Sequence, residues 1–346
     1  MKTEREALLV KLRMLKPAIA TGGPIPILQC LWVAKDRSTA YNDIIAIQVP
    51  LEADFVGGLV GSPLLGLLES SASEGVTLIA NGAAVALTAG GTKAKLPLLP
   101  TERCPFTLPV VKPEVPITAE LLAALDFVMV VLQGVSSFTG AGVALVAESD
   151  TLTLYATDNT TLAWAMLRKP DKVAEQRFIL SVPFCEQLLA LGKEGGALFL
   201  DEQKAVATFA DGSRLYGRLV EQKEPVDYAG VVKRFVPDPE KNPPVPLPEG
   251  LAAALDRAAI VAGGQPATIQ CRIEKAALLL DHTGAFGELH ERLALVKGAG
   301  DLAAANFDAG MLRHVLPKAT DFLFTEEAFF LLGADVDGGY ICAAVR

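Results

Sequence analysis

One short stretch of the chain collects the side chains that metal ions and acid–base catalysts use. Residues 281–291 contain His282 and His290 together with Asp281, Glu288 and Glu291. Imidazoles and carboxylates are common ligands of zinc, which can activate a water molecule for hydrolysis. Their spacing, however, matches no standard ligand pattern. We therefore interpret the stretch as the polar edge of a hairpin and keep a metal-dependent hydrolase only as an alternative function.

Other motifs for catalysis or nucleotide binding are incomplete. Gly-Ala-Gly at 140–142 is half of a dinucleotide fingerprint, because the third glycine and the strand–helix context are missing. The chain contains no Walker A sequence. Ser62 lies in Gly-Ser-Pro, whereas a nucleophile elbow requires Gly-x-Ser-x-Gly. We therefore expect a protein that is not an enzyme and binds no cofactor or metal.

Composition limits the class of protein further. The chain has 346 residues, of which 51% are apolar, so it can form two or three domains with sizeable cores. The formal net charge of -9 argues against a protein that coats nucleic acid with a basic surface, although it allows one small basic face. The five cysteines are scattered and odd in number, which is typical of reduced thiols in the cytosol.

No segment has the pattern of a signal peptide or a membrane span. The N-terminal segment is charged throughout. The most apolar run, Leu121–Val135, contains Asp126 and is shorter than the ~20 residues that cross a bilayer. We therefore expect a soluble, cytoplasmic protein that makes no contact with membranes.

A repeated pattern organises the elements of the chain. Phe178–Val220 has the pattern of a strand, a short amphipathic helix, and two or three further strands. Similar stretches begin near Phe55 and Leu302, and their leucine-rich helices lie about 120 residues apart. Solenoid repeats have periods of only ~20–50 residues. The spacing therefore indicates that whole domains are repeated.

A helix and two strands precede each repeated stretch. Thr118 is a plausible N-cap for the second of these helices. Proline-rich linkers are expected at 110–118 and 236–250. The expected helices cover 3–20, 118–135 and 250–263, and the expected strands cover 27–34, 38–49, 142–148, 151–158, 267–273 and 276–280.

The whole pattern predicts an α+β fold with antiparallel sheets. Strands outnumber helices, and Asn-Gly or Asp-Gly turns at 81–82, 211–212 and 337–338 fall between alternating runs, as hairpin turns do. We place three similar domains at residues 1–112, 113–240 and 241–346, each with two helices packed on sheets.

Several short motifs, and their order along the chain, resemble those of one known family. PIL at 26–28 and LPLLP at 96–100 are similar to its first domain, and LYATD at 154–158 with Leu162 is similar to its ATDG-x-x-L. PVDY at 225–228 resembles its FPDY, RAAIV at 257–261 its RAAIL, and YICAAVR at the end its Y-V-V-M-P-M-R, while Asn306 would open the last helix. The family is the beta subunit of bacterial DNA polymerase III, the beta sliding clamp, here in a divergent form of the kind that a phage could encode.

The resemblance implies a ring. Two chains would join head to tail into six domains, with helices lining the hole and sheets outside. Double-stranded DNA would pass through without sequence preference, and a DNA polymerase, a clamp loader and other replication or repair factors would dock on one face. The function implied is that of a processivity factor in DNA replication.

Cations on the inner helices would face the DNA. The expected helices at 55–69 and 118–135 carry no Lys or Arg, so this lining would be weakly basic. A clamp-fold scaffold that does not encircle DNA therefore stays an alternative. The DNA-facing candidates are Lys11, Arg13, Lys16, Lys193, Arg257, Arg313 and Lys318.

The resemblance also implies a groove between the second and third domains for a short apolar peptide, and a dimer interface. Small residues near the C-terminus stand where the family has Met-Pro-Met, which removes adaptable apolar surface and predicts a shallower groove. Ile260 and Val261 match family positions at the dimer contact. The groove candidates are Thr157, Asn159, Leu162, Val226, Val231, Ile341, Ala343, Ala344 and Val345.

Overall fold

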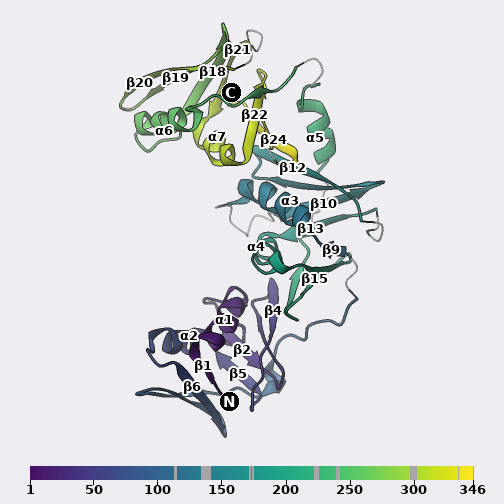
Figure 1. Ribbon diagram of the computed structural model, residues 1–346, viewed down its shortest axis with the longest axis vertical. Helices are drawn as coiled ribbons and strands as arrows, with labels where there is room; N and C mark the ends of the chain where they lie inside the picture. The colour runs from purple at the N-terminus through teal and green to yellow at the C-terminus, as the bar shows by residue number, and fades with distance from the viewer. Residues whose placement is uncertain are drawn as a thin grey trace. The chain divides into compact units, whose positions relative to one another are not determined.

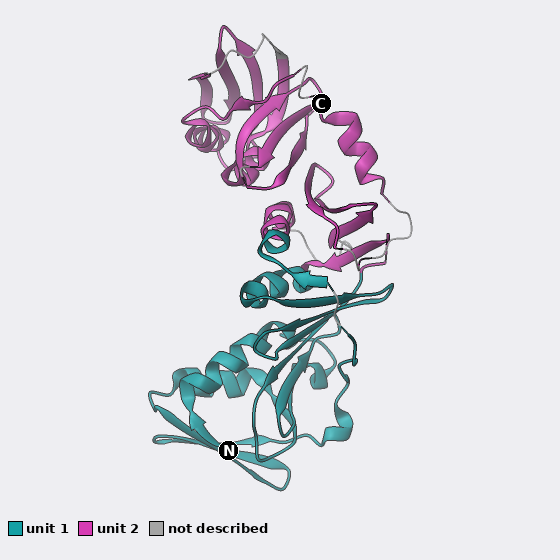
Figure 2. Ribbon diagram, turned by 45° about the vertical axis from the view of Figure 1, so that its right-hand side comes forward, with its two compact units in different colours: residues 1–122, 183–219 teal, residues 123–182, 220–346 magenta. Residues whose placement is uncertain are grey.

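The computed structural model describes residues 1–112, 115–133, 142–170, 173, 175–221, 226–238, 242–296, 302–333 and 335–345 (Figure 1). The chain forms two compact units, residues 1–122 with 183–219 and residues 123–182 with 220–346 (Figure 2). Each unit combines helices with antiparallel sheets, so the predicted α+β class is confirmed.

Unit 1 contains one sheet of eight strands and one of four. In spatial order the larger sheet is β5 (Gly57–Val60), β2 (Cys30–Val33), β3 (Arg37–Tyr41), β4 (Ile45–Pro50), β16 (Arg214–Arg218), β15 (Lys204–Phe209), β14 (Gly196–Leu200) and β9 (Val115–Ile117). The smaller sheet is β1 (Lys2–Glu4), β6 (Gly75–Asn81), β7 (Ala84–Ala89) and β8 (Thr92–Pro97).

Unit 2 has the same two kinds of sheet. The larger one is β13 (Arg177–Ser181), β10 (Gly142–Glu148), β11 (Thr151–Thr157), β12 (Thr161–Arg168), β24 (Asp337–Ala343), β23 (Ala328–Gly333), β22 (Ala319–Phe324) and β17 (Val245–Pro246). The smaller one is β20 (Gly287–Ala294), β19 (Ala277–Gly284), β18 (Thr268–Glu274) and β21 (Leu302–Asp308).

Seven α-helices accompany these sheets in the described part of the chain. They are α1 (Arg5–Leu15), α2 (Gly61–Ser70), α3 (Ala119–Met129), α4 (Val182–Leu191), α5 (Tyr228–Phe235), α6 (Leu251–Ala262) and α7 (Ala309–Val315). None of the helices within the described ranges has the length and apolar character of a membrane span.

The eight-stranded sheets explain why the units differ from the predicted blocks. Each larger sheet takes four strands from one predicted block and four from the next, as β4 pairing with β16 and β12 pairing with β24 illustrate. The assignment of three domains to 1–112, 113–240 and 241–346 stays a prediction.

The first helix is shorter than predicted. Lys2–Glu4 forms β1 and pairs with β6, and α1 begins only at Arg5. Its apolar stripe is buried as expected, with Leu8, Leu9, Leu12 and Leu15 all at most 2% exposed. Lys16–Ala18 is a 3-10 turn, because Pro17 has no N–H with which to continue the α-helix.

The expected strand at 38–49 is two strands joined by a turn. Asp43 adopts the left-handed region with φ of 76°. The side-chain oxygen of Asn42 accepts hydrogen bonds from the N–H groups of Ile44 (3.1 Å) and Ile45 (2.9 Å). Asn and Asp favour such turns because their side chains can bond to nearby backbone.

Both proline-rich linkers contain a short strand that the sequence did not indicate. β9 lies within 110–118 and β17 within 236–250, and each is the outermost strand of its sheet. An edge position tolerates proline because one side of the strand needs no hydrogen bonds. Asn306 was expected to open the last helix but lies in β21, and Asp308 caps α7 by accepting from the Met311 N–H at 3.0 Å.

The C-terminal end of α3 bonds to two other elements of unit 2. The predicted N-cap is present, since Thr118 Oγ1 accepts from the Leu121 N–H at 3.2 Å. At the other end the buried Tyr340 hydroxyl donates to the Phe127 carbonyl at 2.8 Å, and the two rings stack with centroids 4.4 Å apart. The Val130 carbonyl lies 2.6 Å from His314 Nε2. These bonds satisfy carbonyl groups that a helix leaves unpaired at its end.

A cluster of buried aromatic rings in unit 2 predicts a position where stability is sensitive to substitution. Phe329 is 1% exposed and its ring centroid lies 5.3 Å from that of Phe307 and 5.4 Å from that of Phe322. Phe329→Ala should destabilise unit 2 by about 3–5 kcal/mol, since it removes buried surface and leaves a cavity. Val296→Ala is the control in the same unit, because that side chain is 83% exposed and its truncation should change stability by under about 0.5 kcal/mol. Urea unfolding of both variants measures this, and equal effects would contradict the packing described.

Candidate functional site

A cavity of about 300 Å³ opens on the larger sheet of unit 2, between strands β11, β12, β23 and β24 and helix α5. It brings together most of the predicted groove residues. Those that line it are Thr157, Asn159, Leu162, Val226, Val231, Ile341 and Ala343.

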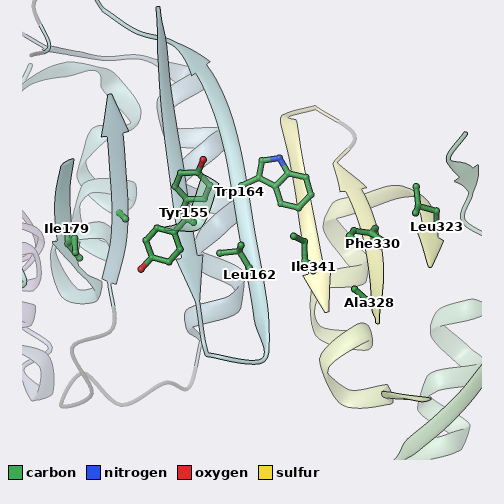
Figure 3. Packing of buried hydrophobic residues seen from close by; sticks show 10 residues of the cluster. Tyr155, Leu162, Trp164, Ile179, Leu323, Ala328, Phe330 and Ile341 are labelled. Carbon is green, nitrogen blue, oxygen red and sulfur yellow. The ribbon is translucent and has the colours of Figure 1, made fainter. Parts of the chain in front are cut away.

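Two register partners form the apolar floor of this cavity. Leu162 on β12 lies directly opposite Ile341 on β24, and they are 7% and 5% exposed. Both belong to one buried cluster with Ala328 and Phe330 of the neighbouring strand (Figure 3). A floor of this kind suits an apolar side chain from a partner.

A tight turn between β11 and β12 forms one rim. Asn159 has φ of 75°, the left-handed conformation that Asn tolerates better than most residues. The carboxylate of Asp158 accepts from the N–H groups of Thr160 (2.9 Å) and Thr161 (2.6 Å). The Thr157 hydroxyl donates to the Thr161 carbonyl at 2.8 Å. The polar groups of the rim are therefore held by the turn itself.

Helix α5 forms the opposite rim. Asp227 caps it by accepting from the Gly230 N–H at 2.8 Å. The ring of Tyr228 stacks on that of Tyr155 with centroids 5.3 Å apart, and the Arg177 guanidinium lies 4.8 Å from the Tyr228 centroid. Arg177 also donates to the Val226 carbonyl at 2.9 Å. These contacts attach the start of α5 to the sheet.

A second hollow of about 400 Å³ adjoins the cavity, because Val226 and Tyr228 line both. Its rim carries the carboxylates of Glu148, Glu175 and Asp227. Burial raises the pKa of the Tyr155 hydroxyl on its floor, and the charges of Glu148 and Asp227 raise it further. The groove therefore continues past Tyr228 into a hollow whose lining carries three carboxylates and the guanidinium of Arg177.

Two predicted groove residues do not line the cavity. The Ala344 N–H donates to the Glu327 carbonyl at 2.9 Å, and the Val345 N–H donates to the Asn306 carbonyl at 2.8 Å. Sequence reasoning left out Tyr228, Phe235, Glu327 and Ala328, which do line it. The helical spacing of Val231, Val232 and Phe235 after the potential N-cap Asp227 was the signal in the sequence that could have predicted α5.

Among the comparisons with known proteins, only the comparison with solved structures found similar proteins. No family model matches the sequence, and no curated protein matches it. The structure is similar to that of the beta subunit of the DNA polymerase of Streptococcus pyogenes (18% identity, TM-score 0.84, 100% of this chain and 99% of the other). It also matches the DNA polymerase III beta subunit of Thermotoga maritima (18%, 0.82, 100% and 98%) and a DNA polymerase sliding clamp of Pseudomonas aeruginosa (20%, 0.80, 100% and 99%).

The chain has the sliding-clamp fold. The resemblance to the sliding-clamp family, which was predicted from scattered motifs, is therefore confirmed for the fold. The whole chain takes part in the match, so both units belong to the clamp fold.

The cations predicted to face DNA in unit 1 of this clamp fold lie on or next to helices. Lys11 and Arg13 lie on α1, and Lys16 and Lys193 lie on the 3-10 turns that follow α1 and α4. Arg13 pairs with Glu6 at 3.2 Å and contacts Glu69 at 3.5 Å. Among the described residues, no ion pair involves Lys11, Lys16 or Lys193.

The cations predicted to face DNA in unit 2 are all paired with carboxylates. Arg257 on α6 contacts Glu291 at 2.5 Å, and Arg313 on α7 contacts Asp256 at 2.8 Å. Lys318 forms an ion pair with Asp126. The pairs of Arg313 and Lys318 are about half exposed, and pairs of this kind add little to stability. A phosphate could therefore replace the carboxylate, but the net positive charge of this surface is low.

The residues predicted for the dimer interface lie at the end of α6. Ile260 is 70% exposed, and Val261 is half-buried beside it. Phe286, which sequence reasoning left out, is 78% exposed and its ring lies close to Gly263 at the same end of α6. The Phe286 N–H donates to the Val261 carbonyl at 3.0 Å. Three apolar side chains therefore lie near the same end of α6, and two of them are exposed.

The stretch at 281–291 is the hairpin that the sequence predicted. It spans the turn between β19 and β20, and β20 is the outer strand of its sheet. The ring of His282 is 7% exposed with Nδ1 2.8 Å from the Thr268 carbonyl, whereas His290 Nδ1 lies 2.7 Å from Asp281 Oδ1. Within the described ranges, no three His, Cys, Asp or Glu side chains are grouped so that they could hold a metal.

This hairpin predicts a measurable titration. The hydrogen bond to Asp281, then that to Glu288, raises the pKa of His290 above its ordinary value. The protonated ring is therefore favoured by the fold, and this stabilisation is present at low pH and is lost as pH rises through the raised pKa. Asp281→Asn should lower the pKa of His290 in an NMR titration. Glu274→Gln removes an exposed carboxylate from the same sheet and should leave the titration unchanged; a drop in both variants would contradict the specific pairing.

Proposed function

We propose that the chain is a DNA polymerase processivity clamp. The observation that carries this proposal is the match of the entire chain to solved beta subunits at TM-scores of 0.80–0.84, with 98–99% of those chains covered. A match over part of the chain could mean that only one domain is shared, whereas this match covers both units and every described sheet.

In the proposed assembly two chains close a ring of six domains, three from each chain at 1–112, 113–240 and 241–346. Edge strands of the two smaller sheets support this arrangement, β8 in unit 1 and β20 in unit 2. A free edge can pair with a strand of another chain. The apolar side chains of Ile260, Val261 and Phe286 lie on the unit that carries β20 and would be covered by the second chain.

Topology would hold the DNA in such a ring, so the contacts with the duplex can be weak. Lys11, Lys16 and Lys193 would attract phosphates through screened, water-mediated contacts. Arg257 and Arg313 would contribute less while they pair with carboxylates. A shallow energy profile along the duplex permits sliding, and the overall charge of -9 would keep DNA from binding elsewhere.

The cavity of unit 2 would bind an apolar peptide from a polymerase, a clamp loader or a repair factor. Leu162 and Ile341 would contact an apolar side chain, and the turn at Thr157–Thr161 would offer polar groups at the rim. The protein itself would carry out no chemical reaction. It would act in the cytoplasm, where the DNA is copied.

Retention on DNA tests the proposed function directly. The wild-type protein, loaded by its clamp loader, should remain on closed circular DNA and leave linear DNA through the ends. Ile260→Lys would place a charge in the proposed contact between chains and should give monomers by light scattering and at least tenfold less protein on circles. Val110→Lys, at a side chain that is 96% exposed, is the matched control and should behave as the wild type.

Each alternative gives a different result in the same experiment. Equal retention on circular and linear DNA would identify a surface binder and refute encirclement. Absence of retention with an intact dimer would favour the clamp-fold scaffold, which the pairing of cations in unit 2 keeps as the second candidate. An intact dimer from Ile260→Lys would refute the assigned contact.

The groove predicts a separate binding defect. Thr157→Tyr would fill the cavity from β11 and should weaken the binding of a labelled Leu-Phe peptide at least tenfold, as measured by fluorescence anisotropy. Thr151→Tyr introduces the same side chain at an exposed position of the same strand and should leave the affinity unchanged. If both variants bind as the wild type does, the peptide binds elsewhere.

A further inference from the structure

The larger sheets of the two units correspond strand for strand. In unit 1 the turn between β3 and β4 has Tyr41 opposite Ala46, and in unit 2 the turn between β11 and β12 has Thr157 opposite Leu162. Each turn has its left-handed residue at the same place, Asp43 with φ of 76° and Asn159 with φ of 75°. The residues of one turn can therefore be matched to those of the other.

The next strands extend this correspondence to the groove. Ala46 lies opposite Tyr216, just as Leu162 lies opposite Ile341. Tyr216 in turn lies opposite Val206, just as Ile341 lies opposite Phe330. Tyr41, Ala46 and Tyr216 thus occupy in unit 1 the positions that Thr157, Leu162 and Ile341, three of the residues lining the cavity, occupy in unit 2.

In unit 1 a segment of the chain itself covers these positions. The ring of Phe106 stacks on that of Tyr41, with centroids 4.4 Å apart and planes at 18°, and its centroid lies 4.8 Å from that of Tyr216. Leu108, two residues further on, is 7% exposed and packs in the same cluster with Ala46 and Val206. Phe106 and Leu108 therefore fill the surface that stays open in unit 2.

This segment is attached to the larger sheet of unit 1 mainly through its side chains, as a bound peptide would be. Residues 104–111 belong to no helix or strand. Among the described residues, no backbone–backbone hydrogen bond joins 105–111 to the sheet. The Pro109 carbonyl accepts from the Arg214 guanidinium at 2.6 Å, whereas Val110 is 96% exposed. Insertion of Phe106 and Leu108 is the main attachment.

We propose that unit 1 contains a second peptide-binding groove whose resident ligand is the chain's own segment at 105–111. Another extended segment that carries an aromatic residue, followed two positions later by an aliphatic one, can take its place. The attached segment acts as an internal competitor, because a short tether gives it an effective concentration of about millimolar. This site lies outside the proposed groove of unit 2 and does not depend on DNA binding.

A peptide supplied in solution tests the proposal. Phe106→Ala in the full chain empties the space between Tyr41 and Tyr216, and a synthetic peptide of residues 101–112 should then bind one to one. The wild type should bind this peptide at least tenfold more weakly, because its groove is filled. The same peptide with alanine in place of its phenylalanine should lose at least tenfold in affinity for Phe106→Ala. Fluorescence anisotropy in reducing buffer measures all three affinities.

Two further variants identify the site. Thr157→Tyr fills the groove of unit 2, so binding to Phe106→Ala should persist when both changes are combined. Val110→Ala alters an exposed side chain of the same segment and should bind the peptide as weakly as the wild type does. Should Phe106→Ala fail to fold, Phe106→Val also vacates the aromatic space and replaces it. Binding by a folded variant that is no tighter than that of the wild type, or that disappears with Thr157→Tyr, would overturn the proposal.

Discussion

Antiparallel pairing between distant parts of the chain is the constraint on which the rest of the structure depends. β4 pairs with β16 in unit 1, and β12 pairs with β24 in unit 2. A shift of one residue in either pairing would turn the inward-facing side chains of the strand outward, so burial fixes the register. The groove floor lies on this pairing, because Leu162 and Ile341 are register partners. The shape of the cavity is therefore determined by a sheet.

The pairing of cations with carboxylates is the second feature of the structure that bears on function. The chain is acidic overall, and several cations on the helices are already paired with carboxylates, such as Arg313 with Asp256 and Lys318 with Asp126. Exposed ion pairs of this kind are weak and are screened by salt. In the proposed clamp, a surface built from them would attract phosphates weakly and in no fixed register. That property suits a protein that would hold its ligand by closure and would need to move along it.

The sequence predicted the repeated arrangement of helices and strands well, because that arrangement follows from local periodicity. It failed where distant pairing decides the structure. Proline-rich segments became the edge strands β9 and β17, and each larger sheet joins strands from two successive predicted blocks. Motif matching placed Leu162 and Ile341 in one cavity but also included Ala344 and Val345, whose backbone groups bond elsewhere. The ion pair of Arg257 with Glu291 had no local signal, since the two residues are far apart in the chain.

The hydrogen bond from the Tyr340 hydroxyl to the Phe127 carbonyl attaches one face of the larger sheet in unit 2 to α3. Tyr340 precedes Ile341 on β24, and side chains alternate along a strand, so one points to α3 while the other points to the cavity. A ligand seated on Ile341 thus presses on a strand whose opposite side is hydrogen-bonded to a helix terminus. Mechanical load applied by a docked protein would be shared with α3 instead of bending the strand alone.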